Sequence, residues 1–353
     1  SVVTLGVLLP MFGTAASGHA SMSTWTPRVG VYQAMREIND KTDGVEDALL
    51  PGTRLLFAYA DSKCESGDAL QAALRLTQNA FGTNGVDAII GAGCSSASLM
   101  ASNVASGAQV PMISPSSHAP ELSDNAHHYF LRTIPSDEWL AHGMVDVLQH
   151  RFGYQRVALI SSSDAYSAGA ARAFGSQAIS KGLSISASVT FLQESTDFAQ
   201  QNHQLLRSNV RVLILFAQGI DGARFMNQSL LSGVGGNGYL WMVGDSSLTD
   251  QPLIWINEAV KQRALRGLFS LIPSDMRGTE NHNAYLERRR QLPAMSSDDG
   301  WCSLEKDDDG SSYLWAQDED SNEDTPPRCA NDDLHRESTY DAFGYDAVFA
   351  VAR

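Results

Sequence analysis

Residues 86–118 read VDAIIGAGCSSASLMASNVASGAQVPMISPSSH. The apolar segments at 86–90 and 110–113 are typical of strands that are buried on both faces of a parallel sheet. Between them, residues 95–108 have the length of a helix and begin with serines, which favour helix N-termini. A strand, a helix and a second strand in this order predict a β-α-β unit of a parallel sheet.

The same alternation extends in both directions along the chain. Strands are predicted at 2–9, 54–60, 86–90, 110–113, 129–132, 156–161, 185–191, 211–216, 239–243 and 267–272, and helices at 69–81, 95–108, 166–181, 199–208, 222–231 and 339–353. Two more helices are predicted to begin at Thr26–Pro27 and at Ser136. Ten strands exceed what one twisted sheet usually holds. We therefore predict a doubly wound α/β fold in two lobes, each a mostly parallel sheet flanked by helices.

The length and the charge of the chain restrict its class. With 353 residues it has room for two domains, and 43% of its residues are hydrophobic. The formal net charge of −15 argues against nucleic acid as a partner, because a phosphate-binding surface needs a basic footprint. No apolar run approaches the ~18–20 residues of a membrane span. The chain begins with Ser1, and we expect a signal peptide to have been removed.

The acidic residues are concentrated in one segment. Residues 298–333 contain 13 acidic and two basic residues, a net charge of −11, so that all other residues together carry −4. Because the segment has little apolar surface to bury, we expect a mobile acidic loop, 296–333, inserted into a near-neutral globule. Part of it resembles a calcium-binding loop, but Ala316 stands where a bidentate Glu belongs, and no metal is predicted.

Four cysteines, Cys64, Cys94, Cys302 and Cys329, allow three pairings. Cys64 and Cys94 each follow a predicted strand, and adjacent strand ends of one sheet can bring cysteines within disulfide range. Cys302 and Cys329 bracket the acidic loop. The economical pairing joins Cys64 to Cys94 and Cys302 to Cys329. Two such disulfides imply an oxidising compartment, whereas four reduced thiols imply a cytosolic protein.

Common catalytic motifs are absent from the sequence. It contains no GxGxxG, GxxxxGK[ST], HExxH or GxSxG, and we predict no cofactor. One enzyme alternative stays open, because Cys94 at a strand–helix turn resembles a nucleophile elbow, with His118 or His142 as a base. The competing interpretation of Cys94 is a disulfide cysteine.

Two sets of polar residues follow predicted strands, where ligands of such folds bind. Hydroxyls and helix N–H groups, which suit a carboxylate, come from the turn and loop that contain Ser95, Ser96, Ser116, Ser117 and His118. Acids and a phenol, which suit an ammonium group, come from Asp137, Tyr166 and Asp245. Each of these residues alone is also explained by capping of its own helix. Together the two sets are complementary to a zwitterionic amino acid.

Five segments carry a resemblance to a known family: 59–64 (YADSKC), 91–98 (GAGCSSAS), 110–114 (VPMIS), 129–137 (YFLRTIPSD) and 345–350 (YDAVFA). They resemble the extracellular Venus-flytrap domain of class C G-protein-coupled receptors, such as the metabotropic glutamate and GABA receptors, and more distantly bacterial periplasmic amino-acid-binding proteins. The resemblance covers nearly the whole chain and implies the two-lobed type I periplasmic-binding-protein fold. Lobe I would comprise 1–133 plus 274–353, without its C-terminal part, and lobe II 134–273.

The resemblance also implies roles for single residues. Ser95 matches the serine that binds the ligand α-carboxylate, and the α-ammonium partners are matched by Asp137, Tyr166 and Asp245, with Gly244 as adjacent backbone. His118 stands where the family has Ser or Thr as a second carboxylate donor, and histidine is larger and titrates near neutrality. In this family, as in the GABA receptor, the cysteines at the positions of Cys64 and Cys94 form a disulfide. Metabotropic glutamate receptors carry a further pair around a variable loop, where Cys302 and Cys329 fall.

By this resemblance the chain is the extracellular ligand-binding domain of a cell-surface receptor, which closes on a small amino-acid-like ligand and signals across the membrane. The expected partners are a membrane domain and a second chain, in a homo- or heterodimer through lobe I. Asn227, in an Asn-Gln-Ser sequon, is a glycosylation candidate. Three alternatives stay open: a solute-binding protein for amino-acid transport, the ectodomain of a receptor guanylate cyclase, and the Cys94 hydrolase.

Overall fold

A computed structural model of the chain describes residues 1–10, 28–78, 85–244, 262, 266–274, 276–291 and 341–352. Its contacts divide the chain into two compact units: unit 1 comprises Ser1–Ser117, Asp124–Ile134 and Ser274–Arg353, and unit 2 comprises His118–Ser123 and Pro135–Pro273. Five sequence predictions lie outside the described residues, namely those for the acidic loop, Cys302, Cys329, Asp245 and the helix start at Thr26–Pro27.

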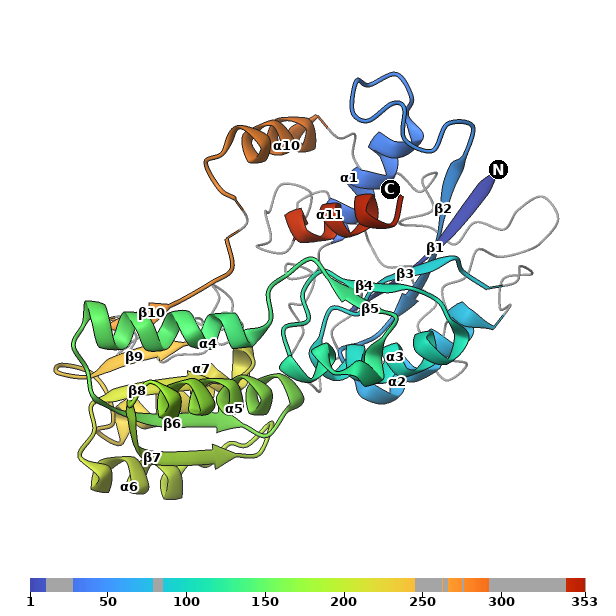
Figure 1. Cartoon of the computed structure of the whole chain (residues 1–353). Coiled ribbons are helices and arrows are strands. Elements are labelled where there is room, and N and C mark those ends of the chain that lie inside the picture. The colour runs from blue at the N-terminus through green and yellow to red at the C-terminus, as the bar shows by residue number, and fades with distance from the viewer. Residues whose placement is uncertain are drawn as a thin grey trace. The chain divides into compact units, whose positions relative to one another are not determined.

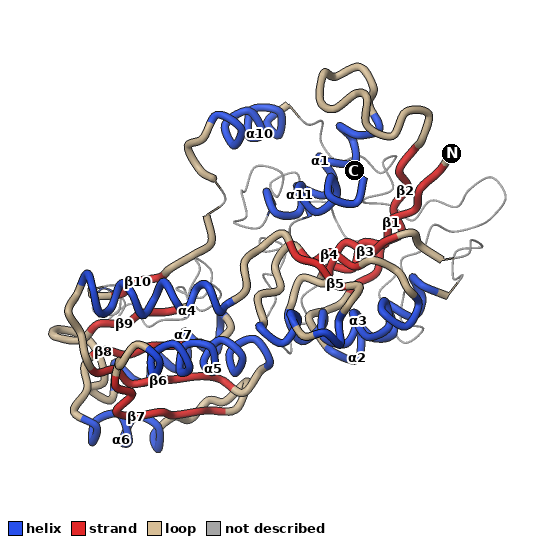
Figure 2. Tube along the Cα trace, viewed as in Figure 1, coloured by secondary structure: helices blue, strands red, loops and turns tan. Residues whose placement is uncertain are grey.

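Unit 1 is built on a parallel sheet whose described strands follow the order β2-β1-β3-β4-β5. The strands are β1 (Val2–Leu9), β2 (Arg54–Asp61), β3 (Ala88–Gly91), β4 (Met112–Ser114) and β5 (Phe130–Arg132), shown in red in Figure 2. Strand β1 pairs along its whole length with β2, from Val2 opposite Arg54 to Leu9 opposite Asp61, and its second half pairs with β3. The first strand therefore lies inside the sheet.

Helices cover both faces of this sheet (Figure 1). Helices α1 (Arg28–Asn39) and α11 (Asp341–Ala352) pack together on one face, and α2 (Ser66–Thr77) and α3 (Ser95–Ala108) pack together on the other. In β1, Leu5, Val7 and Leu9 join the core that contains α1 and α11. Gly6 faces the opposite way, toward Leu76 of α2. Both faces of the strand are buried, which explains its unbroken apolar sequence.

Helix α10 (Glu280–Arg290) belongs to unit 1 and is missing from the sequence predictions. Its N-cap is Thr279, whose side-chain oxygen accepts a hydrogen bond from the His282 N–H at 3.3 Å. Polar contacts hold it to α1, because Arg288 Nε lies 2.9 Å from Glu37 Oε1 and a Gln33 amide donates to the Tyr285 carbonyl. A helix held in this way has no apolar stripe, and hydrophobic periodicity could not reveal it.

Unit 2 has a second parallel sheet, with described strands in the order β10-β9-β8-β6-β7. The strands are β6 (Arg156–Ser162), β7 (Ser184–Phe191), β8 (Val212–Phe216), β9 (Leu240–Val243) and β10 (Leu268–Ser270). The helices are α4 (Asp137–Asp146), α5 (Ala165–Ser180), α6 (Ala199–Ser208) and α7 (Gly219–Leu231). Alternate residues of β6 enter two cores: Val157 and Leu159 pack with α4 and α5, and Ala158 and Ile160 with α6 and α7.

The two parallel sheets with helices on both faces confirm the predicted α/β class. All ten predicted strands are present, with ends that differ by up to two residues. The helices at Ser95–Ala108 and Ala199–Ser208 have the predicted ends, and α4 begins after its N-cap Ser136, whose oxygen accepts from the Glu138 N–H. Strong local patterns thus located most of the elements.

The segment 118–123 differs from the predicted lobe assignment. The predicted boundaries place it in lobe I, whereas its contacts place it in unit 2. Glu121 forms an ion pair with Arg172 of α5, and the Asp137 N–H donates to the His118 carbonyl at 3.0 Å. The chain therefore passes from unit 1 to unit 2 and back before the predicted crossing near residue 133. The other predicted lobe boundaries remain predictions.

Candidate functional site

The turn at 91–96, here called the serine turn, lies at the carboxyl end of β3 in unit 1. Strand β1 lies between β2 and β3, and the helices that follow β1 and β3 cover opposite faces of the sheet. Such a switch point leaves a crevice at the strand ends, where doubly wound proteins bind their ligands. The serine turn occupies this place, and it leads into the N-terminus of α3 at Ser95.

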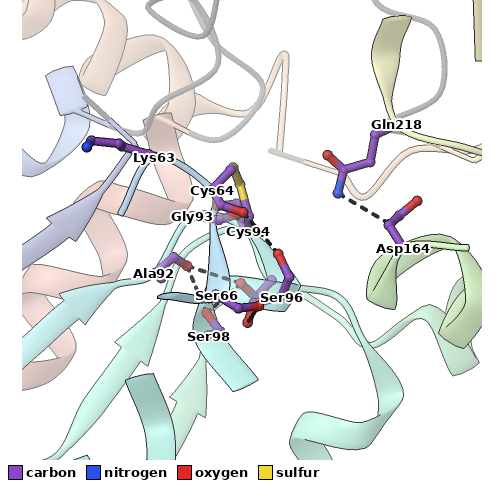
Figure 3. Close-up of a disulfide and its surroundings, with 12 residues drawn as sticks. Lys63, Cys64, Ser66, Ala92, Gly93, Cys94, Ser96, Ser98, Asp164 and Gln218 are labelled. Atoms are coloured by element: carbon purple, nitrogen blue, oxygen red, sulfur yellow. Dashed lines mark hydrogen bonds between the residues drawn. A yellow bond between two sulfur atoms is a disulfide. The ribbon is translucent and has the colours of Figure 1, made fainter. Parts of the chain in front are cut away.

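A disulfide joins Cys64, after β2, to Cys94 in the serine turn (Figure 3), with the Cα atoms 5.3 Å apart. This confirms the predicted pairing of these two cysteines. It also excludes Cys94 as a nucleophile in this state, because a bonded sulfur has no thiolate to attack with. The hydrolase alternative that rested on Cys94 is therefore wrong for the bonded protein.

Hydrogen bonds from serine hydroxyls stabilise the serine turn. Ser96 Oγ donates to the Cys64 carbonyl at 3.1 Å, and Ser116 Oγ donates to the Gly93 carbonyl at 2.7 Å. Ser117 Oγ donates to the Ala92 carbonyl at 3.1 Å. These bonds join the loop after β4 to the turn after β3, so the serines predicted at the site do come together in unit 1. Their hydroxyls are engaged with the backbone in this structure.

Ser95 is the first residue of α3 and is only 4% exposed. The N–H groups of the first helical turn point toward the strand end, and with the helix dipole they favour an anion. Hydroxyls and helix N–H groups thus come together at the serine turn, and their binding of a carboxylate stays a prediction.

Three other predicted residues meet in unit 2, and we call them the His–Asp–Tyr cluster: His118, Asp137 and Tyr166. Asp137 begins α4, and Tyr166 lies in the first turn of α5. His118 Nδ1 lies 3.9 Å from Asp137 Oδ1, and the His118 and Tyr166 rings stand edge to face with centroids 6.4 Å apart. All three side chains are at least 97% buried. The cluster is an enclosed group of one acid, one imidazole and one phenol.

Gly244, which follows β9, provides room for the phenol of this cluster. A Cβ atom at this position would lie 2.7 Å from the Tyr166 hydroxyl oxygen and 3.0 Å from Phe216 Cδ1. Gly244, which is predicted as backbone adjacent to the ligand, therefore lies next to Tyr166. Any larger residue at position 244 would displace the phenol.

Two polar residues at the switch point of unit 2 are not among the predicted site residues. Asp164, 8% exposed, caps α5 after β6, and Gln218 stands at the N-cap position of α7 after β8. Gln218 Nε2 donates to Asp164 Oδ1 at 3.4 Å (Figure 3). Strands β6 and β8 are neighbours whose following helices cover opposite faces. The rule that singled out the serine turn would also have found these residues if the strand order had been known.

Other candidates lie apart from these groups. Asn227 is half-buried in α7, and the hydroxyl of the sequon's Ser229 is buried and donates to Asn202 Oδ1 at 2.7 Å. His142 pairs along α4 with Asp146, at 3.3 Å. Within the described ranges, no three His, Cys, Asp or Glu residues are arranged to hold a metal ion. No helix in the described part of the chain has both the length and the apolar composition that crossing a bilayer requires.

Residues 27–353 match the family described as the receptor family ligand binding region. Metabotropic glutamate receptor 6 of Mus musculus is 29% identical over 276 residues, which cover 69% of this chain and 31% of the receptor. Glutamate receptor 3.1 of Oryza sativa subsp. japonica is 25% identical over 326 residues, which cover 92% of this chain and 30% of that receptor.

Among solved structures, the leucine binding protein LivK of Thermotoga maritima superposes with a TM-score of 0.71 at 18% sequence identity, covering 99% of this chain and 81% of that protein. The chain therefore has the two-lobed type I periplasmic-binding-protein fold. It belongs to the receptor family ligand binding region, as the sequence resemblance implied. It spans 31% of the length of the mouse receptor.

Proposed function

We propose that this chain is the extracellular ligand-binding domain of a cell-surface receptor and that it closes on a small amino-acid-like ligand. One observation carries the proposal: each unit has a polar group at the carboxyl ends of its strands, and the two groups have complementary chemistry. The serine turn offers helix N–H groups and hydroxyls, whereas the His–Asp–Tyr cluster offers a carboxylate and an aromatic ring. An α-amino acid carries the matching carboxylate and ammonium.

In this proposal Ser95 and the first turn of α3 bind the ligand α-carboxylate, with Ser96, Ser116 and Ser117 holding the turn in shape. Asp137 and Tyr166 bind the ammonium group, through charge and through the face of the ring. Gly244 keeps space for Tyr166. Asp245, which lies outside the described residues, stays a predicted ammonium partner.

A ligand that contacts both units favours the arrangement in which both contacts are made at once. It shifts the open–closed equilibrium by its difference in affinity for the two states. A difference of ~5.5 kcal/mol takes such an equilibrium from 1:99 to 99:1. In a receptor this shift is the signal, and it would pass through a dimer of lobe I and a membrane domain. The metabotropic glutamate receptor among the relatives supports this output.

A second candidate function is solute binding for amino-acid transport. The likeness to a leucine binding protein favours it, since the same two-lobed fold serves that protein. The ectodomain of a receptor guanylate cyclase remains a further alternative within the receptor class. The sequence of the full gene product distinguishes the three outputs, and ligand binding is common to all of them.

The proposal predicts binding of at least one of the twenty L-amino acids, measured as a rise in melting temperature and then by calorimetry. Bound ligand stabilises by RT ln(1 + [L]/Kd), so a 100-fold excess over Kd adds about 2.7 kcal/mol. Asp137→Ala and Tyr166→Ala should each weaken that binding about threefold, because each removes a partner of the ammonium group. Ser95→Ala should weaken an amino acid more than its α-amide, which lacks the carboxylate charge.

Ser106→Ala is the matched control. Ser106 lies in the last turn of the same helix, and its buried hydroxyl has no hydrogen-bond partner in the structure. The variant should bind like the wild type. Unchanged affinity in both Asp137→Ala and Tyr166→Ala would remove these residues from the site. Equal losses for acid and amide in Ser95→Ala would refute the carboxylate assignment.

A further inference from the structure

The imidazole of His118 lies beside both groups that the proposed function assigns to the ligand ammonium. Its Nδ1 atom is 3.9 Å from Asp137 Oδ1, and its ring meets the Tyr166 ring edge to face. His118 is 2% exposed and Asp137 1% exposed, so water has almost no access to the pair. The imidazole of His118 thus lies next to the Asp137 carboxylate.

The backbone holds His118 in this place. Its carbonyl accepts a hydrogen bond from the Asp137 N–H at 3.0 Å, at the start of α4. Three residues further along, Glu121 forms an ion pair with Arg172 of α5. The close approach to α5 depends on Gly169, where a Cβ atom would lie 3.2 Å from Pro120 Cδ. Because the segment is attached to both helices, its backbone keeps the His118 ring near Asp137.

An imidazole and an ammonium group compete for the same partners. A buried carboxylate is costly unless a donor or a cation is near it, and an imidazole N–H or an imidazolium supplies that. Tyrosine rings attract both kinds of cation. An ammonium group that binds Asp137 Oδ1 therefore competes with the His118 ring for this carboxylate oxygen. A small hydroxyl residue at this position would leave the carboxylate open to the ligand.

We propose that His118 determines the ligand specificity of this site by occupying the ammonium position in unit 2. The inference rests on the proposed function, because it takes Asp137 and Tyr166 as the ammonium partners. It assigns His118 to the residues that face the ligand ammonium. The sequence resemblance instead assigns this position to the residues that bind the ligand carboxylate. The consequence is a site that gains little from the α-ammonium of its ligand and also accepts carboxylic acids without an amino group.

The test compares wild type and His118→Ser with two matched pairs of probes. L-glutamate and L-leucine are paired with glutarate and 4-methylpentanoate, which are the same acids without the ammonium group. In the wild type we expect each pair to bind with affinities within about threefold. In His118→Ser we expect the affinity of the better-bound amino acid to rise on the order of tenfold, as for one charge-assisted hydrogen bond. The affinity of its partner acid should stay within about threefold of the wild-type value.

Three controls accompany this measurement. His282→Ser replaces another buried histidine, in α10 of unit 1, and should alter neither affinity. Adding Asp137→Asn to His118→Ser should abolish the gain, because the ammonium loses its charged partner. His118→Asn serves as a second variant if the serine variant does not fold, since it also removes the ring, and the same gain is expected from it.

The outcomes separate the two proposals. If the wild type binds an amino acid tenfold or more above its partner acid and His118→Ser adds nothing, the His118 inference is overturned while the proposed function stands. An equal gain for both members of a pair overturns it too, because the ring would then act by bulk alone. If none of the four probes and none of the twenty amino acids binds to any variant, the proposed function itself fails.

Discussion

At the scale of single residues, Gly169 determines how closely the segment 118–123 lies to unit 2. A Cβ atom at this position would meet Glu121 Oε2 at 2.8 Å and Pro120 Cδ at 3.2 Å. The carboxylate is the end of a flexible side chain and can turn away, whereas the proline ring is part of the chain. A side chain at position 169 would therefore push outward the segment that carries His118.

We expect Gly169→Ala to stabilise unit 2 less than Gly175→Ala does. In the interior of a helix such a change stabilises by about 0.5–1 kcal/mol. At Gly175, on the same helix, the nearest atom to the new methyl group is Ile185 Cδ1 at 3.9 Å, so the full gain should appear. At Gly169 the contact with Pro120 should cancel part or all of it. Urea unfolding of both variants measures the difference, and equal gains would mean that the segment yields without cost.

At the scale of elements, α10 is attached to α1 and α11 by a group of polar side chains. Arg288 contacts Glu37 through Nε at 2.9 Å and the Tyr345 hydroxyl through Nη2 at 3.2 Å. The Tyr345 hydroxyl in turn donates to Glu37, and its ring lies 5.2 Å from that of Tyr285. These contacts explain how a helix without an apolar stripe belongs to the core of unit 1.

The pKa of Tyr345 makes this attachment sensitive to alkali. Burial raises the pKa of the phenol well above its ordinary value of 10.0, and the Glu37 carboxylate raises it further by disfavouring a second negative charge. The folded chain therefore keeps a proton that the unfolded chain loses, and stability falls as the pH rises above about 10.

We expect Tyr345→Phe to lower the unfolding free energy by about 1–3 kcal/mol near pH 8, because the hydrogen bonds to Glu37 and Arg288 are lost. The same variant should lose less stability than the wild type between pH 9 and about 11. Denaturant unfolding across this range measures both effects. Parallel pH curves for the two proteins would contradict the role of the phenol.

At the scale of the whole molecule, each unit has a hydrophobic core of its own. The core of unit 1 lies between its sheet and helices α1 and α11, and those of unit 2 lie on the two faces of its sheet. The disulfide belongs to unit 1 alone and closes a loop of 30 residues. Such a cross-link stabilises by ~3 kcal/mol, mainly by restricting the unfolded chain.

Replacing Cys64 and Cys94 together by serine should therefore lower the melting temperature of one unit. We expect two calorimetric transitions, of which the variant shifts the one that belongs to unit 1 and leaves the other within a degree or two. A shift of both transitions by equal amounts would mean that the units unfold as one. Reduction of the wild type should reproduce the effect of the variant.

Much of the fold could be predicted because its elements have strong local patterns. The ten strands are short apolar runs, and helices such as Ser95–Ala108 start at polar residues next to them. The disulfide between Cys64 and Cys94 followed from their places after two strands. Helix α10 could not be predicted, because its partners Glu37 and Tyr345 are about 250 residues before it and 57 residues after it.

The residue chemistry of the candidate site was readable along the chain, since hydroxyls, acids and a phenol follow strands that local hydrophobicity identifies. Only packing in three dimensions decided which of them meet. His118 follows three serines of unit 1 in the sequence, yet its side chain lies with Asp137 and Tyr166 in unit 2. The cause is a set of contacts between distant residues, namely Glu121 with Arg172 and Pro120 with Gly169. The local sequence pattern indicates the chemistry that a residue can supply, whereas contacts between residues that are far apart in the sequence determine its position in the fold.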